Sequence, residues 1–506
     1  MTQLAPDVLA WLSRAAGWEP ETRAFIDGGY RGFARSSRFE SIAPRDGSTL
    51  AHIEDAGVES VDAAVAAARI AFDDGRWRRM PSRQRAEILR RFAMLVLAHR
   101  DEIGLAESLE VGKPISEALA ADVGETAEAL HWYADALDKV HDEVITSPEH
   151  TLLTVTREPL GVVGAIVPWN FSSIIAAWKF APALATGNSV VLKPSELSSL
   201  PALILGRLAT EAGIPDGVFN VVPGRGSTVG SALARHPGID KITFTGSTTV
   251  ARRIAVDAAT SNMKAVSIEA GGKSPQVVFD DVEDWERMVA TVAGSIFYNA
   301  GQACTAGSRV LVHESVHDRL LEDLVSKATE WMPSDPLATS TKMGAIASRE
   351  QLDEILAKLE ANRSGKIVFG GEQVEPVPGG FYLEPTIIDG VDSRASISRE
   401  EVFGPVLTVL SFRDDTEALH AANDTEYGLA AGVWTANLSR THRMLRELRA
   451  GIVWANDYNA LGIERPFGGV KGTGTGRDKG IQALAQYTSS KTSWIDFRGA
   501  LSDGMS

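Results

Sequence analysis

A chain of 506 residues is too long for one hydrophobic core, because single cores stop growing at about 250 to 300 residues. Its 66 acidic and 50 basic residues leave a net charge of −16, which repels phosphate backbones and anionic membranes. Two large domains are therefore expected, and neither nucleic acid nor a membrane is an expected partner.

Targeting and metal signals are absent from the sequence. The first twenty residues lack the basic start, apolar run and cleavage site of a secretory signal, so a cytoplasmic protein is expected. The most apolar stretch, 161–192, is interrupted by proline, asparagine and lysine, which favours a buried strand, turn and helix over a membrane span. One cysteine excludes an internal disulfide, and the ten histidines show no clustering, so no metal site is predicted.

The first half of the chain alternates between predicted helices and strands. Residues from Asp62 through the segment 131–144 are expected to be mainly helical. Short apolar runs then predict strands separated by helices that end near Gly187 and Gly213. This alternation predicts a doubly wound parallel sheet with strands at 161–167, 189–192, 218–222, 241–245 and 265–268.

Residues suited to ligand binding follow each predicted strand. Ligands of open parallel sheets bind beyond the carboxyl ends of the strands, so these residues are expected to converge there. They are Pro168, Trp169 and Asn170; Lys193, Ser195 and Glu196; the segment 223–226 with Gly230; Gly246 and Ser247; and Glu269.

Several of these residues match the chemistry of a dinucleotide. Lys193 and Glu196 are suited to ribose hydroxyls, and a carboxylate there repels a 2′-phosphate, which predicts NAD with NADP possible. Gly246 and Ser247 begin a helix whose N-terminus can hold pyrophosphate. The glycine turn with Gly226 and Gly230 is one residue longer than GxGxxG and is weak by itself.

A second α/β alternation from about 276 to 457 carries Cys304. The segment FYNAGQACTAG ends a helix with a glycine-rich turn, where a thiol can be exposed beside backbone N–H groups. Cys304 is therefore a candidate nucleophile, Glu269 a candidate general base, and Asn170 a candidate oxyanion donor. The alternatives are a buried small cysteine, a structural glutamate and a turn amide.

The fold prediction is completed by two polar, strand-like segments at 151–156 and 487–496. Exposed edges of this kind are usually covered by a partner, which indicates an oligomerisation arm. The fold class is then α/β, with two doubly wound domains and a small β arm. The predicted parts are a dinucleotide domain (1–145 and 160–272), a catalytic domain (273–478), and bridging segments (146–159 and 479–506).

Seven motifs together resemble the aldehyde dehydrogenase superfamily, from about Ala24 to Phe497. They are PWNF, LKPSE, FTGST, EAGGKSP, GQACTAGSR, EEVFGPV and PFGGVKGTGTGRDKG, in the order of that family. The resemblance implies the roles given above for Cys304, Glu269 and Asn170. It also implies Glu401 as a ligand of the nicotinamide ribose, with Phe403 beside it, and homodimers or homotetramers built through bridging strands. The sequence departs from the family at Ala251, Ala270 and Asp478.

Within the superfamily the chain is most similar to γ-glutamyl-γ-aminobutyraldehyde dehydrogenases, through WYADALDKV, EAGGKS and GRDK. It departs from them at LGIER, 461–465, where an acidic GDM segment is usual. The resemblance implies an aldehyde tunnel, for which the matching residues are Phe171, Ile174, Ile175, Trp178 and Tyr298.

A medium-length aliphatic or ω-amino aldehyde is the expected substrate. A cationic tail would lie over Trp178 or Tyr298, with Glu464 as the carboxylate at the mouth. The alternative is that Glu464 pairs with Arg465 in solvent and selects nothing.

Three other functions compete with NAD-dependent oxidation of an aldehyde to an acid. A CoA-acylating dehydrogenase would not need Glu269 as a hydrolytic base. A non-catalytic structural protein on the same scaffold would be expected to lose Cys304 or Glu269. A thiol hydrolase without a cofactor would leave the motifs at the strand ends unexplained.

Overall fold

The first sheet has seven strands in the order β11-β10-β7-β8-β9-β1-β2. The strands from β11 to β9 are parallel, whereas β1 and β2 add an antiparallel edge. All five strands predicted for this sheet are confirmed within two residues at either end. The strands are β7 (Val162–Ile166), β8 (Ser189–Lys193), β9 (Phe219–Val221), β10 (Lys241–Thr245), β11 (Ala265–Glu269), β1 (Ala24–Ile26) and β2 (Gly29–Arg31).

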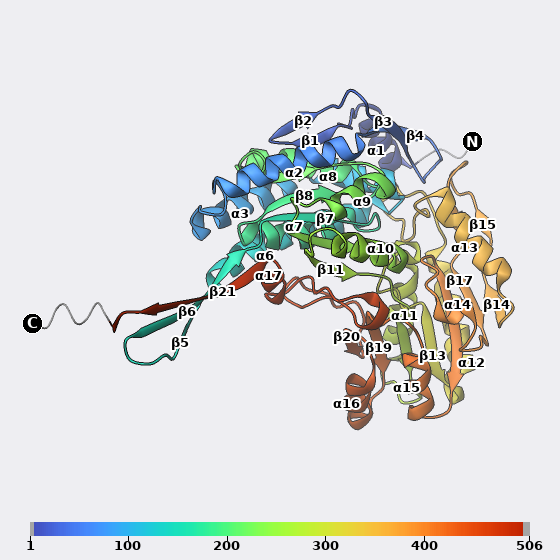
Figure 1. The fold of residues 1–506 in the computed structure, drawn as a ribbon. Helices are drawn as coiled ribbons and strands as arrows, with labels where there is room; N and C mark the ends of the chain where they lie inside the picture. Colours follow the sequence, from blue (N-terminus) through green and yellow to red (C-terminus); the bar gives the residue numbers. More distant parts are fainter. Residues whose placement is uncertain (1–4, 499–506) are drawn as a thin grey trace, which may run out of the picture.

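Helices cover both faces of this sheet (Figure 1). Along β7, Val163 and Ala165 belong to one buried cluster, whereas Val162 and Ile166 belong to a second. A strand buried on both faces needs apolar residues at every position, which explains the continuous apolar runs in the sequence. The helices of this part are α2 (Gly57–Asp73), α3 (Ser82–Ala98), α4 (Arg100–Val111), α5 (Ile115–Glu117), α6 (Val123–Ala136), α7 (Ser172–Ala185), α8 (Leu200–Ala212), α9 (Ser231–Arg235) and α10 (Thr248–Ala259).

The sheet order places a switch point between β7 and β10. From β7 the chain proceeds through β8 and β9 in one direction, then returns to β10 and β11 on the other side. The loops that leave β7 and β10 therefore diverge and leave a crevice at the carboxyl ends of the strands. The predicted residues Trp169 and Gly246 lie on these two loops.

The N-terminal part differs from the mainly helical prediction at its end. Helix α6 ends at Ala136, and Glu143–Ile145 form strand β5, so the expected helix over 131–144 is too long. Strand β5 pairs with β6 through Glu143 to Ile145, and this tertiary pairing outweighs the helical pattern of the segment. Before these elements lie α1 (Pro6–Ala16) and a hairpin of β3 (Ser37–Ile42) and β4 (Thr49–Asp55).

A second seven-stranded sheet has the order β14-β17-β18-β13-β12-β19-β20. All its pairings are parallel except that of β14 with β17, which confirms a second α/β unit. Its strands are β12 (Pro275–Val278), β13 (Arg309–His313), β14 (Lys366–Phe369), β17 (Thr386–Asp389), β18 (Val406–Phe412), β19 (Ala430–Trp434) and β20 (Ile452–Ala455). Its helices are α11 (Trp285–Phe297), α12 (His317–Ala328), α13 (Arg349–Ala361), α14 (Ser396–Arg399), α15 (Asp415–Asn423) and α16 (Leu438–Glu447). A small pair, β15 (Gln373–Val374) and β16 (Tyr382–Leu383), lies beside it.

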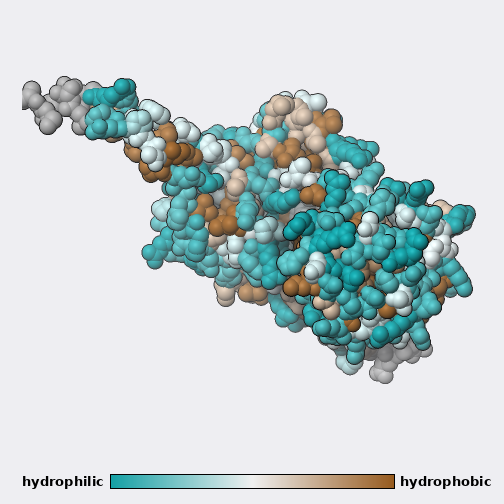
Figure 2. Space-filling model, turned by 90° about the horizontal axis from the view of Figure 1, so that it is seen from below, coloured by the Kyte–Doolittle hydropathy of each residue, from teal (hydrophilic) through white to brown (hydrophobic). Residues whose placement is uncertain are grey.

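A three-stranded antiparallel arm projects from the body (Figure 1). Its order is β21-β6-β5, with β6 (Thr151–Pro159) and β21 (Thr488–Asp496) paired over nine residues, and α17 (Gln482–Ala485) precedes β21. Apolar side chains lie on its surface (Figure 2), among them Val144, 75% exposed, and Trp494, 60% exposed.

The computed structural model describes residues 5–498, so the predicted bridging segment 479–506 falls partly outside the described residues, as do residues 1–4 of the predicted dinucleotide domain. Among the described helices, none combines the length and apolar character needed to cross a membrane.

Candidate active site

Two cavities meet at Cys304. One is a tunnel of about 400 Å³, and the other is a cleft of about 470 Å³ at the carboxyl ends of β7 and β10. Cys304 and Ile175 line both of them. A thiol at this junction can be reached from one side by a molecule in the tunnel and from the other by a molecule in the cleft.

A strained turn presents Cys304 at this junction. After α11, the residues Asn299, Ala300 and Gly301 adopt left-handed backbone conformations with φ of 49°, 53° and 70°. A side chain at Gly301 would place its Cβ 2.1 Å from the carbonyl oxygen of Gly404. Such backbone persists only where the surroundings enforce it, and it turns the chain sharply just before the thiol.

Asn170 lies next to this turn. It follows β7, is buried, and donates from Nδ2 to the carbonyl oxygen of Gln302 at 2.9 Å. Asn299 Nδ2 in turn donates to the carbonyl oxygen of Asn170 at 3.3 Å. A side-chain amide has two N–H groups, so one remains for a developing oxyanion near Cys304.

Glu269 ends β11 in a pocket made of glycine backbone. Its side chain is buried, and neither carboxylate oxygen has a hydrogen-bond partner among the described residues. Side chains at Gly468 and Gly476 would put their Cβ atoms 2.6 and 2.7 Å from Glu269 Oε1. Burial raises the pKa of Glu269 well above its ordinary value, and the charge of Asp478 adds to this effect. A carboxylate held this way is suited to accept a proton.

The pKa of the Cys304 thiol is also raised. Burial and the charges of Glu401 and Glu269 raise it to about 12. The thiol is therefore protonated near neutral pH, and formation of the nucleophilic thiolate needs a base nearby. Glu269 is near enough for its charge to act on the thiol.

The cleft contains most of the predicted residues for the nicotinamide end of a dinucleotide. Ser247 caps α10 by accepting a hydrogen bond from Val250 N at 3.3 Å, so the N-terminus of this helix opens into the cleft. Backbone N–H groups at a helix start and a cleft of this volume fit a pyrophosphate. The predicted residues that line it are Pro168, Trp169, Asn170, Gly246, Ser247, Glu401 and Phe403.

Glu401 lies directly against the glycine turn after β11. Its Oε1 accepts a hydrogen bond from Gly272 N at 3.0 Å, and a Cβ at Gly271 would lie 2.1 Å from Oε2. Burial raises the pKa of Glu401 to about 7. Only glycine at 271 leaves room for this carboxylate, and a Cβ at Gly272 would lie 2.4 Å from the carbonyl oxygen of Cys304. These two contacts explain the two glycines that follow Glu269 and Ala270.

The predicted residues for the ribose at the other end lie outside the cleft cavity. Lys193, at the end of β8, is buried and approaches Glu196 Oε2 at 3.4 Å. Burial opposes ionisation of Glu196, but the charge of Lys193 and hydrogen bonds from backbone N–H groups together outweigh it and lower the pKa of that carboxyl. Ser195 lies between them, and a π-helical turn, Gly226–Gly230, lies opposite Glu196.

The tunnel contains five of the six predicted substrate residues. Phe171, Ile174, Ile175, Trp178 and Tyr298 line it, and the rings of Phe171 and Tyr298 stack at 6.1 Å. Glu464 is not among the lining residues; it pairs with Arg465 at 3.0 Å, and both side chains are exposed. The structure thus favours the alternative in which Glu464 forms a surface pair.

Several tunnel residues were missed by sequence reasoning. Three come from separate elements that no motif joins, and the other four lie within 458–467, where LGIER and PFGG were recognised in the sequence without these residues being assigned to the tunnel. They are Glu125, Thr291, Trp331, Tyr458, Asn459, Leu461 and Phe467.

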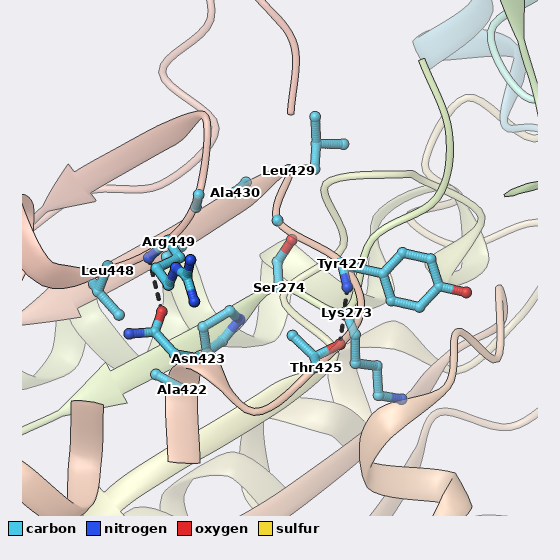
Figure 3. Close-up of a pocket in the computed structure, with 14 residues that line it drawn as sticks. Lys273, Ser274, Ala422, Asn423, Thr425, Tyr427, Leu429, Ala430, Leu448 and Arg449 are labelled. Carbon is cyan, nitrogen blue, oxygen red and sulfur yellow. Dashed lines mark hydrogen bonds between the residues drawn. The ribbon is translucent and has the colours of Figure 1, made fainter. Parts of the chain in front are cut away.

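Another cavity, behind the glycine turn, is too small for a ligand. Its volume of about 10 Å³ suits roughly one water molecule. Figure 3 shows its wall, where Asn423 accepts a hydrogen bond from Arg449 N and Thr425 accepts one from Tyr427 N. Burial lowers the pKa of Lys273 in this wall to about 7. This cavity belongs to the packing of the second sheet.

Comparison with known proteins identifies the family. The model of the aldehyde dehydrogenase family matches residues 33–493. The NADP/NAD-dependent aldehyde dehydrogenase PuuC of Escherichia coli K12 is 45% identical over 486 residues, which cover 96% of this chain and 98% of the relative.

Solved structures agree with this match. The γ-glutamyl-γ-aminobutyraldehyde dehydrogenase of Burkholderia cenocepacia is 50% identical, with a TM-score of 0.95 and coverage of 97% of this chain and 100% of that chain. An indole-3-acetaldehyde dehydrogenase in complex with NAD⁺ is 47% identical, also with a TM-score of 0.95, covering 97% and 99% of the two chains.

The chain belongs to the aldehyde dehydrogenase family. It is an NAD(P)-dependent oxidoreductase that acts on aldehydes, as the sequence motifs predicted. The predicted likeness to γ-glutamyl-γ-aminobutyraldehyde dehydrogenases is confirmed as well.

Proposed function

We propose that the chain oxidises an aldehyde to a carboxylic acid through a thioester on Cys304 that Glu269 helps to hydrolyse. The observation that carries this proposal is the position of Cys304, which lines both the tunnel and the cleft, with the buried Glu269 close by. A nucleophile between a substrate path and a cofactor path, beside a base of raised pKa, has the parts that this chemistry needs.

The residues have separate tasks in the reaction. Glu269 accepts the thiol proton, and Cys304 Sγ attacks the aldehyde carbon to form a thiohemiacetal. Asn170 Nδ2 and the backbone N–H of Cys304 donate to the oxygen that gains charge. When bound in the cleft, the nicotinamide supplies the acceptor for the hydride lost as the thioester forms. After hydride transfer Glu269 loses the thiol proton to solvent. It then takes a proton from water, whose oxygen attacks the thioester carbon, and the acid leaves as the proton returns to the thiolate of Cys304.

Residues on the two sides of the cleft would hold the dinucleotide. Gly246 and Ser247 face its pyrophosphate, Glu401 and Phe403 its nicotinamide half, and Glu196 with Lys193 its adenosine ribose. A carboxylate at 196 favours NAD, while the nearby lysine lets NADP bind more weakly.

The tunnel favours a medium-length aldehyde with an aliphatic or ω-amino chain. Its wall is mostly aromatic and aliphatic, which suits the removal of an alkyl chain from water. The related solved enzymes with γ-glutamyl-γ-aminobutyraldehyde and indole-3-acetaldehyde in their names are compatible with such a tunnel.

One assay separates this function from its alternatives. NADH formation is measured with aliphatic, aromatic and amino aldehydes, with and without CoA. We expect turnover without CoA and release of free acid. If NADH forms only when CoA is present, the enzyme is a CoA-acylating dehydrogenase and the proposed hydrolysis is wrong. If no aldehyde yields NADH, the protein is non-catalytic.

The assembly and location are also part of the proposal. The arm of β5, β6 and β21 exposes Val144, Trp494 and Ile495, and pairing with a second copy would cover them. We propose a homodimer or homotetramer built through this arm, measurable by light scattering. We place the enzyme in the cytoplasm, where a reducing environment keeps the single thiol free.

A further inference from the structure

One charged side chain lies on the wall of the aldehyde tunnel. Among the described residues that line it, Glu125 alone carries an acidic or basic group, and the rest are aromatic, aliphatic or neutral polar residues and the nucleophile. Glu125 is half-buried and forms no hydrogen bond or ion pair with any described residue. It lines the tunnel but not the cleft, so it faces the substrate chain and not the cofactor.

The backbone around Glu125 is held in place by a buried ion pair. A π-helical turn, Ala118–Asp122, leads into α6, and Lys113 Nζ donates to both carboxylate oxygens of Asp122, at 2.8 and 2.6 Å. Both partners of this pair are buried. Because π-helical turns change which side chains share a helix face, this turn sets the direction in which the start of α6 presents Glu125.

Burial destabilises the charged form of Glu125, which a nearby positive charge would stabilise. It raises the pKa of Glu125, and the charge of Lys479 counteracts part of this effect. Lys479 is itself buried and does not line the tunnel. A carboxylate that has lost part of its water gains most from a cation that enters the tunnel.

Two aromatic rings of the tunnel, those of Trp178 and Phe171, are less suited to hold a further cation. Lys479 Nζ lies 4.9 Å from the ring centre of Trp178, and Lys113 Nζ lies 4.2 Å from that of Phe171. Neither lysine lines the tunnel, so each ring already interacts with an ammonium group outside it. A second cation over Trp178, one of the two rings expected from the sequence, would be repelled by the first. The other ring, that of Tyr298, stacks against Phe171.

We propose that Glu125 is the residue that selects substrates with a positively charged end, by pairing with an ammonium group while the aldehyde reaches Cys304. This inference rests on the proposed function and names the substrate class of the same site. The aromatic wall then binds the chain between the two ends, and Glu464 takes no part.

The test uses two aldehydes of the same shape. In 4-(trimethylammonio)butanal a quaternary nitrogen replaces the quaternary carbon of 5,5-dimethylhexanal, so the pair differs in charge alone. We expect wild type to favour the cation, and Glu125→Gln to lower kcat/KM for the cation by about tenfold or more, mainly through KM. The neutral aldehyde should be oxidised at an unchanged rate, which shows that the variant is folded.

Two matched variants complete the design. Glu128→Gln removes an exposed charge one turn further along the same helix, and Glu464→Gln removes the surface carboxylate. Both should leave the ratio of the two substrates unchanged. An equal loss for both substrates in Glu125→Gln, or no loss, overturns the role of Glu125. Absence of NADH from wild type with both aldehydes would instead overturn the proposed function.

Discussion

The cofactor cleft and the aldehyde tunnel meet at one sulfur atom but are built in different ways. The cleft is made of turns and helix starts at strand ends, where glycines such as Gly246 and Gly271 leave room for a ligand or a carboxylate. The tunnel is made of side chains from α6, α7 and α11, with large aromatic rings from the turns at Tyr298, Trp331 and Tyr458. We therefore expect cofactor binding to depend strongly on backbone geometry, and the choice of aldehyde to depend on the side chains of the tunnel.

The largest effect is expected at the junction itself. Cys304→Ser should lower turnover at least about 1000-fold, because a serine hydroxyl is a poor nucleophile without stronger activation. NAD binding, followed by the change in protein fluorescence, should be nearly intact, because the cleft is built by other residues. Retention of more than a small fraction of turnover would remove Cys304 from the reaction.

Glu269→Gln should separate the two halves of the reaction. We expect a slower burst of about one equivalent of NADH per site, because Glu269 no longer accepts the thiol proton. Steady-state turnover should then fall about 100-fold or more, as thioester accumulates. A rapid-quench experiment detects both. Loss of the burst as well would mean that Glu269 is required first to form the thiolate.

The raised pKa of Glu269 also sets a direction for pH dependence. The base works only when ionised, so wild-type turnover should fall as the pH is lowered through a pKa above the ordinary carboxyl range. Thioester hydrolysis in Glu269→Gln should lose that inflection. A wild-type profile that stays flat down to the ordinary carboxyl range would contradict the raised pKa.

Gly301→Ala tests whether the backbone conformation of the turn before Cys304 is needed to position the thiol between the tunnel and the cleft. With φ of 70° and a Cβ 2.1 Å from Gly404 O, alanine should cost about 1 to 3 kcal/mol of stability and displace Cys304. Thermal unfolding and turnover measure the two effects. Gly29→Ala is the control, since its Cβ meets nothing within 4 Å. Equal behaviour of both variants would show that the turn is not strained.

The smallest effect is expected at the adenosine end of the cleft. Glu196→Gln removes the charge that opposes a 2′-phosphate, so the ratio of kcat/KM for NADP to that for NAD should rise by about tenfold. Oxidation of a fixed aldehyde with each cofactor measures it. Equal use of both cofactors by wild type would show that Glu196 does not face the ribose.

The difference between the cleft and the tunnel also explains which parts of the site could be predicted from the sequence. The strands of the first sheet and the turns after them follow local patterns, so the positions of Trp169, Gly246 and Glu269 at strand ends could be predicted from sequence alone. Glu125 and Trp331 reach the tunnel only through tertiary packing, and nothing near them in the sequence marks them. For Glu464 the sequence left two alternatives open, and the side chain pairs with Arg465 at the surface, which is the second of them. The helix expected over 131–144 ended early because Glu143–Ile145 pair with a strand of the arm.

Because the chain has only one cysteine, thiol labelling can measure the fraction of intact active sites. Any thiol-specific label must react at Cys304, so the number of labels per chain counts intact active sites without a substrate. The rate of labelling reports access through the tunnel, and the effect of added NAD on that rate reports filling of the cleft. A preparation can thus be titrated, and tunnel variants compared, before the natural aldehyde is known.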